Sequence, residues 1–263
     1  MEVSKMKKLI AILLMCLALF PAALAAEKAT TEVICINPVD GQGSSNYPRC
    51  YPSTPLIDVV FVIDSTGSMQ DEIRQVKTHI EKIVREVESG YPRPDIRVGL
   101  VTYRDHSPEE YEYLTLNFGF EHDVERALQH LNSIQASGGG DHPEAVADGL
   151  NEAINNMDWR DYHILGQSNY PDYNYETQKP IFLIGDASPH GIGSSDNSFE
   201  QGCPDGLHYK DLAYQAQERG INIFTVSGSG MDSYGINVWQ NIADITGGDY
   251  FKLSYQRVDV DQY

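Results

Sequence analysis

Oxygen-bearing side chains stand at three places along the chain where a metal ion could be held. Asp64, Thr66 and Ser68 occupy alternate positions in one short stretch, Asp141 follows three consecutive glycines, and Asp186 follows an apolar run. Carboxylates and hydroxyls are the ligands that hard divalent cations prefer, whereas no group of cysteines and histidines resembles a closed zinc site. The residue types therefore predict a site for Mg²⁺, with Mn²⁺ or Ca²⁺ as alternatives.

The segment around Asp64 is predicted to form a buried strand that ends in this polar turn and continues into a helix. Val59 to Ile63 is an unbroken apolar run rich in β-branched residues, which fits a strand covered on both faces. From Ser68 onward the apolar residues recur at steps of three and four, as in an amphipathic helix. Ligands of open α/β sheets bind at the carboxyl ends of strands, so this turn is a candidate binding site.

Strands and helices alternate through the rest of the chain, which predicts an α/β fold. The pattern favours strands over residues 57–63, 96–103, 111–118, 179–185, 221–226 and 250–253, and helices over residues 68–88, 123–134, 143–157, 207–219 and 233–245. We expect a mainly parallel sheet with one antiparallel edge strand and helices on both faces. Because parallel strands end at one edge, Asp64, Asp141 and Asp186 can converge there. Glu144 is interpreted as a first-turn helix residue that stabilises the helix dipole.

Taken together and in this order, the three groups resemble the metal-ion-dependent adhesion site of the von Willebrand factor A domain family. The family motif Asp-x-Ser/Thr-x-Ser is matched by Asp64, Thr66 and Ser68, and its second aspartate by Asp186. Where integrin-like members have a threonine, this chain offers Asp141. The resemblance implies a Rossmann-like, doubly wound fold and a metal held through the two hydroxyls and, directly or through water, the aspartates. It also implies that an acidic side chain of a partner protein completes the coordination.

Asp141 in place of a threonine would change the charge of such a site. Three carboxylates leave a bound dication with a net negative charge, so we expect tighter metal binding but weaker attraction for an anionic partner. His106, at the carboxyl end of a predicted strand, and His142 and His190 are expected to lie close to the motifs. Protonated, they would attract an acidic partner, and neutral, they would bind a softer metal. They are therefore predicted to bind the partner in a pH-dependent way, the alternative being that they only form loop hydrogen bonds.

The N-terminus predicts export. Three lysines precede an apolar stretch that ends at Phe20, and small residues suit cleavage after it, so residues 1–25 are interpreted as a secretory signal peptide. No later apolar stretch is long enough to span a bilayer, and the predicted location is secreted or periplasmic. The remaining chain divides into a leader segment over residues 26–55, a domain that carries the resemblance over residues 56–256, and a tail over residues 257–263.

Three cysteines remain after the signal peptide. An oxidising compartment favours a bridge between Cys35 and Cys50, which would close a local loop in the leader segment and leave Cys203 alone. A bridge between Cys50 and Cys203 is the alternative. The sequence does not choose between these pairings.

The net charge and the absence of certain motifs narrow the range of possible functions. The 263-residue chain has a formal net charge of −19, and removing the signal peptide, with its three lysines and one glutamate, makes it −21. This excess of acidic groups argues against nucleic acid and anionic membranes as partners. No Gly-x-Ser-x-Gly elbow, Walker loop or dinucleotide fingerprint indicates an enzyme. We therefore expect a non-enzymatic protein that binds another protein or a surface ligand through its metal.

Three alternatives remain open at this point. The first is a metal-dependent hydrolase in which Asp64, Asp141, Asp186 and His190 activate a water molecule. The second is a passive module in which the cation only joins three loops. The third is that the first motif is a helix cap with no metal at all.

Overall fold

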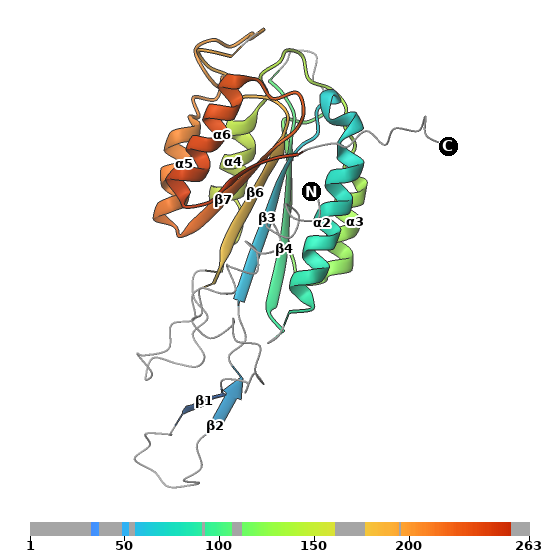
Figure 1. Cartoon of the computed structure of the whole chain (residues 1–263), viewed down its shortest axis with the longest axis vertical. Helices are drawn as coiled ribbons and strands as arrows, with labels where there is room; N and C mark the ends of the chain where they lie inside the picture. The colour runs from blue at the N-terminus through green and yellow to red at the C-terminus, as the bar shows by residue number, and fades with distance from the viewer. Residues whose placement is uncertain are drawn as a thin grey trace, which may run out of the picture.

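The computed structural model describes residues 33–36, 49–52, 56–90, 93–106, 112–160, 177–194 and 196–253. Its centre is a six-stranded sheet with the order β5-β4-β3-β6-β7-β8 (Figure 1). All neighbouring strands are parallel except β5, which pairs with β4 in the antiparallel direction at one edge. The strands are β3 (Leu56–Asp64), β4 (Asp95–Tyr103), β5 (Thr115–Glu121), β6 (Lys179–Gly185), β7 (Ile221–Ser227) and β8 (Tyr250–Lys252). The predicted α/β fold is confirmed.

Helices cover both faces of the sheet because successive side chains of each strand point to opposite sides. Val59, Phe61 and Ile63 of β3 pack with the apolar stripes of α2 (Ile73–Glu88) and α3 (Val124–Ser133). Val60 and Val62 pack on the other face, against α4 (Val146–Asn155), α5 (Tyr209–Glu218) and α6 (Ser233–Thr246). Figure 1 shows the two helical layers on either side of the strands. The unbroken apolar run in β3 is explained by this double cover.

The central position of β3 creates a crevice at the carboxyl end of the sheet. After β3 the chain enters α2 on one face, whereas after β6 it reaches α5 on the other. Adjacent parallel strands whose connections leave to opposite sides open a crevice between them, where ligands bind in α/β proteins. The register pairs Ile63 with Ile184, so Asp64 and Asp186, a short step beyond, lie at the same level. A Cβ atom at Gly185 would lie 2.9 Å from Asp64 Oδ2, so only glycine allows this close approach.

Beyond shifts of one or two residues at the ends of several elements, the observed structure differs from the predicted one in the following ways. A short 3-10 helix, η1 (Gly67–Asp71), precedes α2, so the first helix is not continuous from residue 68. Strand β5 begins later than residue 111. The prediction that Glu144 belongs to the first turn of a helix is wrong, because α4 begins at Val146. The backbone of Glu144 is instead held by a neighbouring loop, since its N–H donates to Ser188 O at 2.9 Å.

The predicted leader segment contains two short strands that the sequence analysis does not identify, β1 (Val33–Ile36) and β2 (Arg49–Pro52). They pair in the antiparallel direction with Cys35 opposite Cys50. Opposed residues of an antiparallel pair have Cα atoms about 4.5–5.5 Å apart, within the range of about 4.4–6.8 Å that a disulfide spans. The Cys35–Cys50 bridge itself stays a prediction.

The predicted signal peptide and tail lie outside the described residues. So do the parts of the leader segment that flank β1 and β2. Among the helices that the structure describes, none combines the length and the apolar character needed to cross a bilayer.

Candidate metal centre

Four of the five predicted ligands form one continuous hydrogen-bonded chain in the crevice. Asp64 Oδ1 accepts hydrogen bonds from the Thr66 backbone N–H at 2.9 Å and from the Thr66 hydroxyl at 2.7 Å. The Ser68 hydroxyl donates to Asp186 Oδ1 at 2.9 Å. The Thr66 and Ser68 hydroxyl oxygens lie 3.1 Å apart. The alternate spacing of the motif therefore connects the end of β3 with the end of β6.

The hydroxyls of Thr66 and Ser68 both donate hydrogen bonds to carboxylates. Each hydroxyl has one O–H group, and those of Thr66 and Ser68 point to Asp64 and Asp186 respectively. The two hydroxyl oxygens lie 3.1 Å apart, and each keeps lone pairs that a cation could accept. The geometry is that of two neutral oxygen ligands oriented by two carboxylates.

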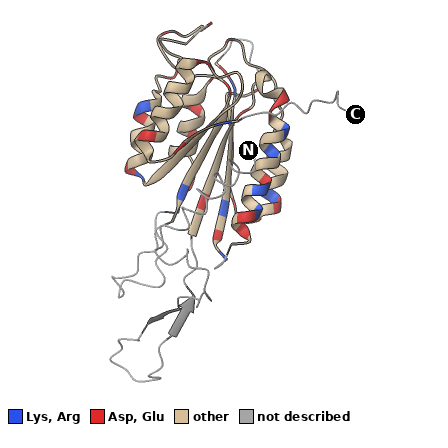
Figure 2. Ribbon diagram, in the orientation of Figure 1, with Lys and Arg blue, Asp and Glu red and all other residues tan. Residues whose placement is uncertain are grey.

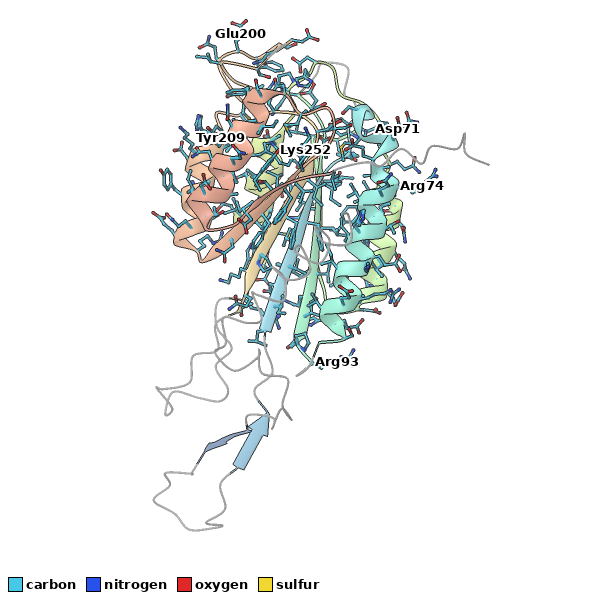
Figure 3. The ribbon with its side chains drawn as sticks, in the orientation of Figure 1. Asp71, Arg74, Arg93, Glu200, Tyr209 and Lys252 are labelled. Atoms are coloured by element: carbon cyan, nitrogen blue, oxygen red, sulfur yellow. The ribbon has the colours of Figure 1, made fainter. Side chains whose placement is uncertain are left out.

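The surrounding loops hold the motif in place. Ser65 N donates to Tyr103 O at 3.0 Å, which ties the turn to the end of β4. Gly67 N donates to Gly138 O at 2.9 Å, so the glycine-rich loop that precedes α4 lies directly against the motif. Asp71 of η1 and Glu200 of the loop before α5 lie at this end of the sheet, whereas Arg93 lies at the opposite end (Figure 3).

Glu144 is a residue of this site that the sequence analysis assigns to another role. Its side chain is buried and lies against the motif: a Cβ atom at Gly139 would be 3.0 Å from Glu144 Oε1 and 3.3 Å from Thr66 Cβ. Gly139 has a φ of +87°, a conformation that favours glycine, and this allows the loop to pass between the two side chains. The signal in the sequence was an acidic residue shortly after the glycine loop, but its place directly after Pro143 suggested a helix start.

Negative charge accumulates in the crevice. Burial, and then the neighbouring Asp186 carboxylate, raise the pKa of Asp64 from 3.8 to about 7. Burial, and then the charges of Asp64 and Asp105, raise the pKa of Glu144 to about 11. Burial also raises the pKa of Asp186, and the nearby Glu72 adds to the effect. Carboxylates with raised pKa values are groups whose ionised forms lack a compensating positive charge.

No lysine or arginine is paired with these carboxylates in the part of the chain that the structure describes. There, no ion pair joins Asp64, Asp186 or Glu144 to a lysine or arginine. One oxygen of Asp64, Oδ2, and one of Glu144, Oε2, are buried without a hydrogen-bond partner. Buried carboxylate oxygens are normally paired or bound to a metal, so these two atoms are available to a cation.

Asp141, the third predicted carboxylate of the site, lies in a different group. Its Oδ2 accepts a hydrogen bond from the Ser198 backbone N–H, and its carboxylate lies within 4.8 Å of ligand atoms of Asp105 and His190. Its place beside the Thr66 hydroxyl is taken by Glu144. Metal binding by Asp141 stays a prediction, and the geometry associates it with the second group.

The three predicted partner-binding histidines occupy unlike positions. His190 is buried, and its Nε2 lies 2.8 Å from Asp105 Oδ1. His106 Nε2 contacts Asp148 Oδ2 at 2.9 Å. His142 is partly exposed, lies 3.7 Å from an Asp232 oxygen and lowers the pKa of Asp186 by its charge. Of the three, His142 is therefore the one placed to interact with the site and with a partner, and its role in binding stays a prediction.

Comparisons with known proteins concern the family of this chain. The family model described as von Willebrand factor A domain matches residues 58–161. The relative named alpha-protein kinase vwkA, from Dictyostelium discoideum, is 28% identical over 174 residues, which cover 65% of this chain and 25% of that protein. The von Willebrand factor A domain-containing protein 7 of Homo sapiens is 33% identical over 112 residues, which cover 43% of this chain and 12% of that protein. These matches support the von Willebrand factor A domain family for this chain, which spans a quarter or less of the length of these curated relatives.

Among solved structures, proximal thread matrix protein 1 from the mussel byssus aligns with a TM-score of 0.48 and 15% sequence identity. The alignment covers 76% of this chain and 42% of that one.

Proposed function

We propose that this protein binds a divalent cation, Mg²⁺ in the first place and Mn²⁺ or Ca²⁺ as alternatives, and uses it to bind another protein or a surface ligand. The observation that carries the proposal is the pair of hydroxyl oxygens of Thr66 and Ser68, 3.1 Å apart with their protons directed to Asp64 and Asp186. A cation beside them would accept lone pairs of both hydroxyl oxygens. It also compensates the charge of the buried carboxylates.

The donor set fits a hard dication. Asp64, Thr66, Ser68 and Asp186 would hold the ion, and the unpartnered Asp64 Oδ2 supplies a ready ligand atom. Glu144 is the acidic residue whose position best supports a further contribution, directly or through its charge. When bound, the ion provides a positive charge that attracts an anionic group of the partner. Hard oxygen donors with no thiol or imidazole at the motif favour Mg²⁺, Mn²⁺ or Ca²⁺ over softer ions.

The hypothesis of a binding protein is better supported than the hypothesis of a metal-dependent hydrolase. The predicted hydrolase would use Asp64, Asp141, Asp186 and His190 together, but Asp141 and His190 lie in the Asp105 group and His190 is already hydrogen-bonded there. The kinase-named relative shares only a quarter of its length with this chain, so its name says nothing of this chain's activity. We therefore propose a non-enzymatic role in which the chain binds a protein or surface ligand. The proposed location outside the cell or in the periplasm rests on the predicted signal peptide.

The metal site is tested first by thermal unfolding. The purified protein is compared in EDTA and in Mg²⁺, Mn²⁺ and Ca²⁺. Because an ion bound only by the folded state stabilises it, the midpoint should rise with at least one ion, and Asp186→Asn should abolish the rise. Asp244→Asn, which changes an exposed aspartate of α6, is the matched control and should respond like the wild type. An equal response of Asp186→Asn and wild type would contradict the proposal.

The binding role is tested with a ligand of defined chemistry. An immobilised array of acidic peptides, with the matching amidated peptides as control, is probed with labelled protein in Mg²⁺ and in EDTA. Retention that requires both the ion and the peptide carboxylate supports a metal-mediated contact. A protein that is stabilised by Mg²⁺ but shows no such retention would leave the cation with a structural role and contradict the adhesive one.

A further inference from the structure

A second cluster of potential metal ligands lies away from the Asp64 motif, where three elements meet. His106 follows β4, Asp148 lies in the first turn of α4, and Cys203 belongs to the loop before α5. His106 Nε2 lies 2.9 Å from Asp148 Oδ2, Cys203 Sγ lies 3.3 Å from the same oxygen, and Cys203 Sγ lies 3.5 Å from His106 Nε2. Three donor atoms of different chemistry therefore form a compact triangle.

This triangle differs from the arrangement of a cysteine nucleophile. A catalytic imidazole contacts the thiol through one ring nitrogen and the carboxylate through the other, so that a proton can pass between them. Here Cys203 and Asp148 both contact Nε2, and they also contact each other. The three side chains converge on one point instead of forming a relay, which is how ligands surround a metal ion.

The distances agree with a tetrahedral zinc site. Zinc bonds of about 2.0–2.1 Å to nitrogen, about 2.3 Å to sulfur and about 2.0–2.2 Å to oxygen imply, at tetrahedral angles, separations of about 3.5–3.7 Å for pairs with sulfur and about 3.3–3.5 Å for the nitrogen–oxygen pair. The separation of 3.5 Å between Cys203 and His106 matches, and the 3.3 Å between Cys203 and Asp148 is a few tenths shorter. The separation of 2.9 Å between His106 and Asp148 is a few tenths shorter, as expected for a hydrogen bond that an ion would replace.

We propose that His106 Nε2, the Asp148 carboxylate and Cys203 Sγ bind Zn²⁺ or a similar borderline-soft transition-metal ion. Binding displaces the thiol proton, and any proton on His106, to solvent, since the ligands act as thiolate and neutral imidazole. A thiolate and an imidazole select such an ion over Mg²⁺, whereas the Asp64 motif offers oxygen alone. The two sites would therefore take ions of different classes.

The surroundings hold the three ligands in position. The His106 backbone N–H donates to Asp105 Oδ1 at 2.6 Å. Gly206 N donates to Cys203 O at 2.9 Å, which closes a tight turn around the cysteine, and Gly206 has a φ of +73° that suits glycine. The Phe199 ring packs edge-on against His106 with ring centroids 6.1 Å apart, and so shields one side of the cluster.

Three protein ligands leave a fourth position for a water molecule or another ligand. A cavity of about 310 Å³ reaches the cluster at Asp148 and is also lined by Glu152 and Asp205. These acidic neighbours favour the approach of a cation. Cys203 is half-buried and is not in a disulfide, so its thiol is available.

The experiment uses Co²⁺ as a spectroscopic probe for Zn²⁺. The protein is first freed of transition metals. It is then kept in saturating Mg²⁺, which would occupy the oxygen site, and titrated with Co²⁺. We expect one equivalent to give the near-ultraviolet thiolate-to-cobalt absorption and the visible bands of a tetrahedral ion, and Zn²⁺ to displace it. Cys203→Ser should lose the thiolate absorption and weaken binding by about tenfold or more. Bound Zn²⁺ should also protect Cys203 of the wild type from alkylation, a readout that needs no variant.

Three controls separate this site from others. Cys35→Ser/Cys50→Ser, which removes the other two cysteines outside the predicted signal peptide, should keep the absorption. His122→Ala, which changes a largely exposed histidine, should keep the affinity. Asp64→Asn should lose the response to Mg²⁺ but keep that to Co²⁺, so that failure of the two proposed sites can be told apart. No thiolate absorption in the wild type, its survival in Cys203→Ser or its loss in Cys35→Ser/Cys50→Ser would overturn the proposal.

Discussion

Strand β3 buries one aspartate near each of its ends. Asp58, near the amino end, accepts hydrogen bonds from Arg97 at 2.9 and 2.6 Å, and from the Arg160 side chain at 2.8 Å. Asp64, at the carboxyl end, is equally buried but has Asp186 and Glu144 as its charged neighbours. Figure 2 shows residues of both charges near the amino ends of the strands.

The difference shows how the same fold can treat a buried charge in two ways. At the amino end two guanidinium groups neutralise Asp58, and all partners are part of the chain. At the carboxyl end the chain supplies negative groups and hydroxyls, and among the described residues no lysine or arginine forms an ion pair with Asp64, Asp186 or Glu144. Ionising a buried group without a partner is costly, so the proposed cation would supply the charge that the carboxyl end lacks. In this proposal one end of the strand contributes stability and the other binds an ion.

The largest loss of stability should come from removing the charge of Asp58 at the amino end of β3. Asp58→Asn leaves the buried Arg97 without its charged partner and Arg160 with Asp95 alone, so we expect a loss of about 3–5 kcal/mol in the free energy of unfolding. Urea unfolding should give the same loss in EDTA and in Mg²⁺, because no ion acts there. Glu88→Gln, which removes the partner of the exposed Arg93, should cost only about 0–1 kcal/mol. Equal losses in the two variants would contradict this account of Asp58.

The next effect is that of Asp64→Asn on the free energy of unfolding, which should have opposite signs with and without metal. Asp64→Asn removes a buried like charge, so in EDTA the variant should be more stable than the wild type. In Mg²⁺ the order should reverse, because the wild type gains about 2.7 kcal/mol when the ion is at a hundred times its Kd and the variant does not. Urea unfolding in both conditions measures this. A variant less stable than the wild type in EDTA would show that Asp64 is neutralised without an ion.

A smaller effect should separate the two candidate third carboxylates. Glu144→Gln should weaken Mg²⁺ binding by about tenfold, or about 1.4 kcal/mol, because it removes a charge beside Thr66. Asp141→Asn should weaken it less, since Asp141 lies with Asp105 and His190. Isothermal titration with Mg²⁺ measures both affinities. The reverse order would restore Asp141 to the position that the sequence suggested.

The smallest effect, taken per pH unit, should be the pH dependence of the stability of the metal-free protein. The folded state raises the pKa of Asp64 from 3.8 to about 7, so between these values it holds a proton that the unfolded state has released. This contribution to stability is therefore lost as the pH rises from about 4 to about 7, by less than about 1.4 kcal/mol per pH unit. The advantage of Asp64→Asn over the wild type in EDTA should grow across this range. A constant difference would mean that the pKa of Asp64 is not raised.

Local pattern predicted most of the fold because it records burial directly. The run Lys179 to Gly185 has the observed bounds of β6, and the Asp64 to Ser68 spacing led to the motif now seen beside Asp186. Glu144 was misassigned because an acidic residue after proline fits a helix start. Its true position depends on a hydrogen bond from its backbone to Ser188, a residue of a distant loop.

The sequence by itself determined the alternation of strands and helices and the oxygen donors that follow β3 and β6, since both depend on residue types at short spacing. Only the tertiary structure decided which carboxylate joins the motif, and that His106, Asp148 and Cys203 meet at one point. Those contacts join residues of separate loops. Their pairing depends on how the glycine loop, α4 and the loop before α5 pack over the sheet, which no local periodicity records.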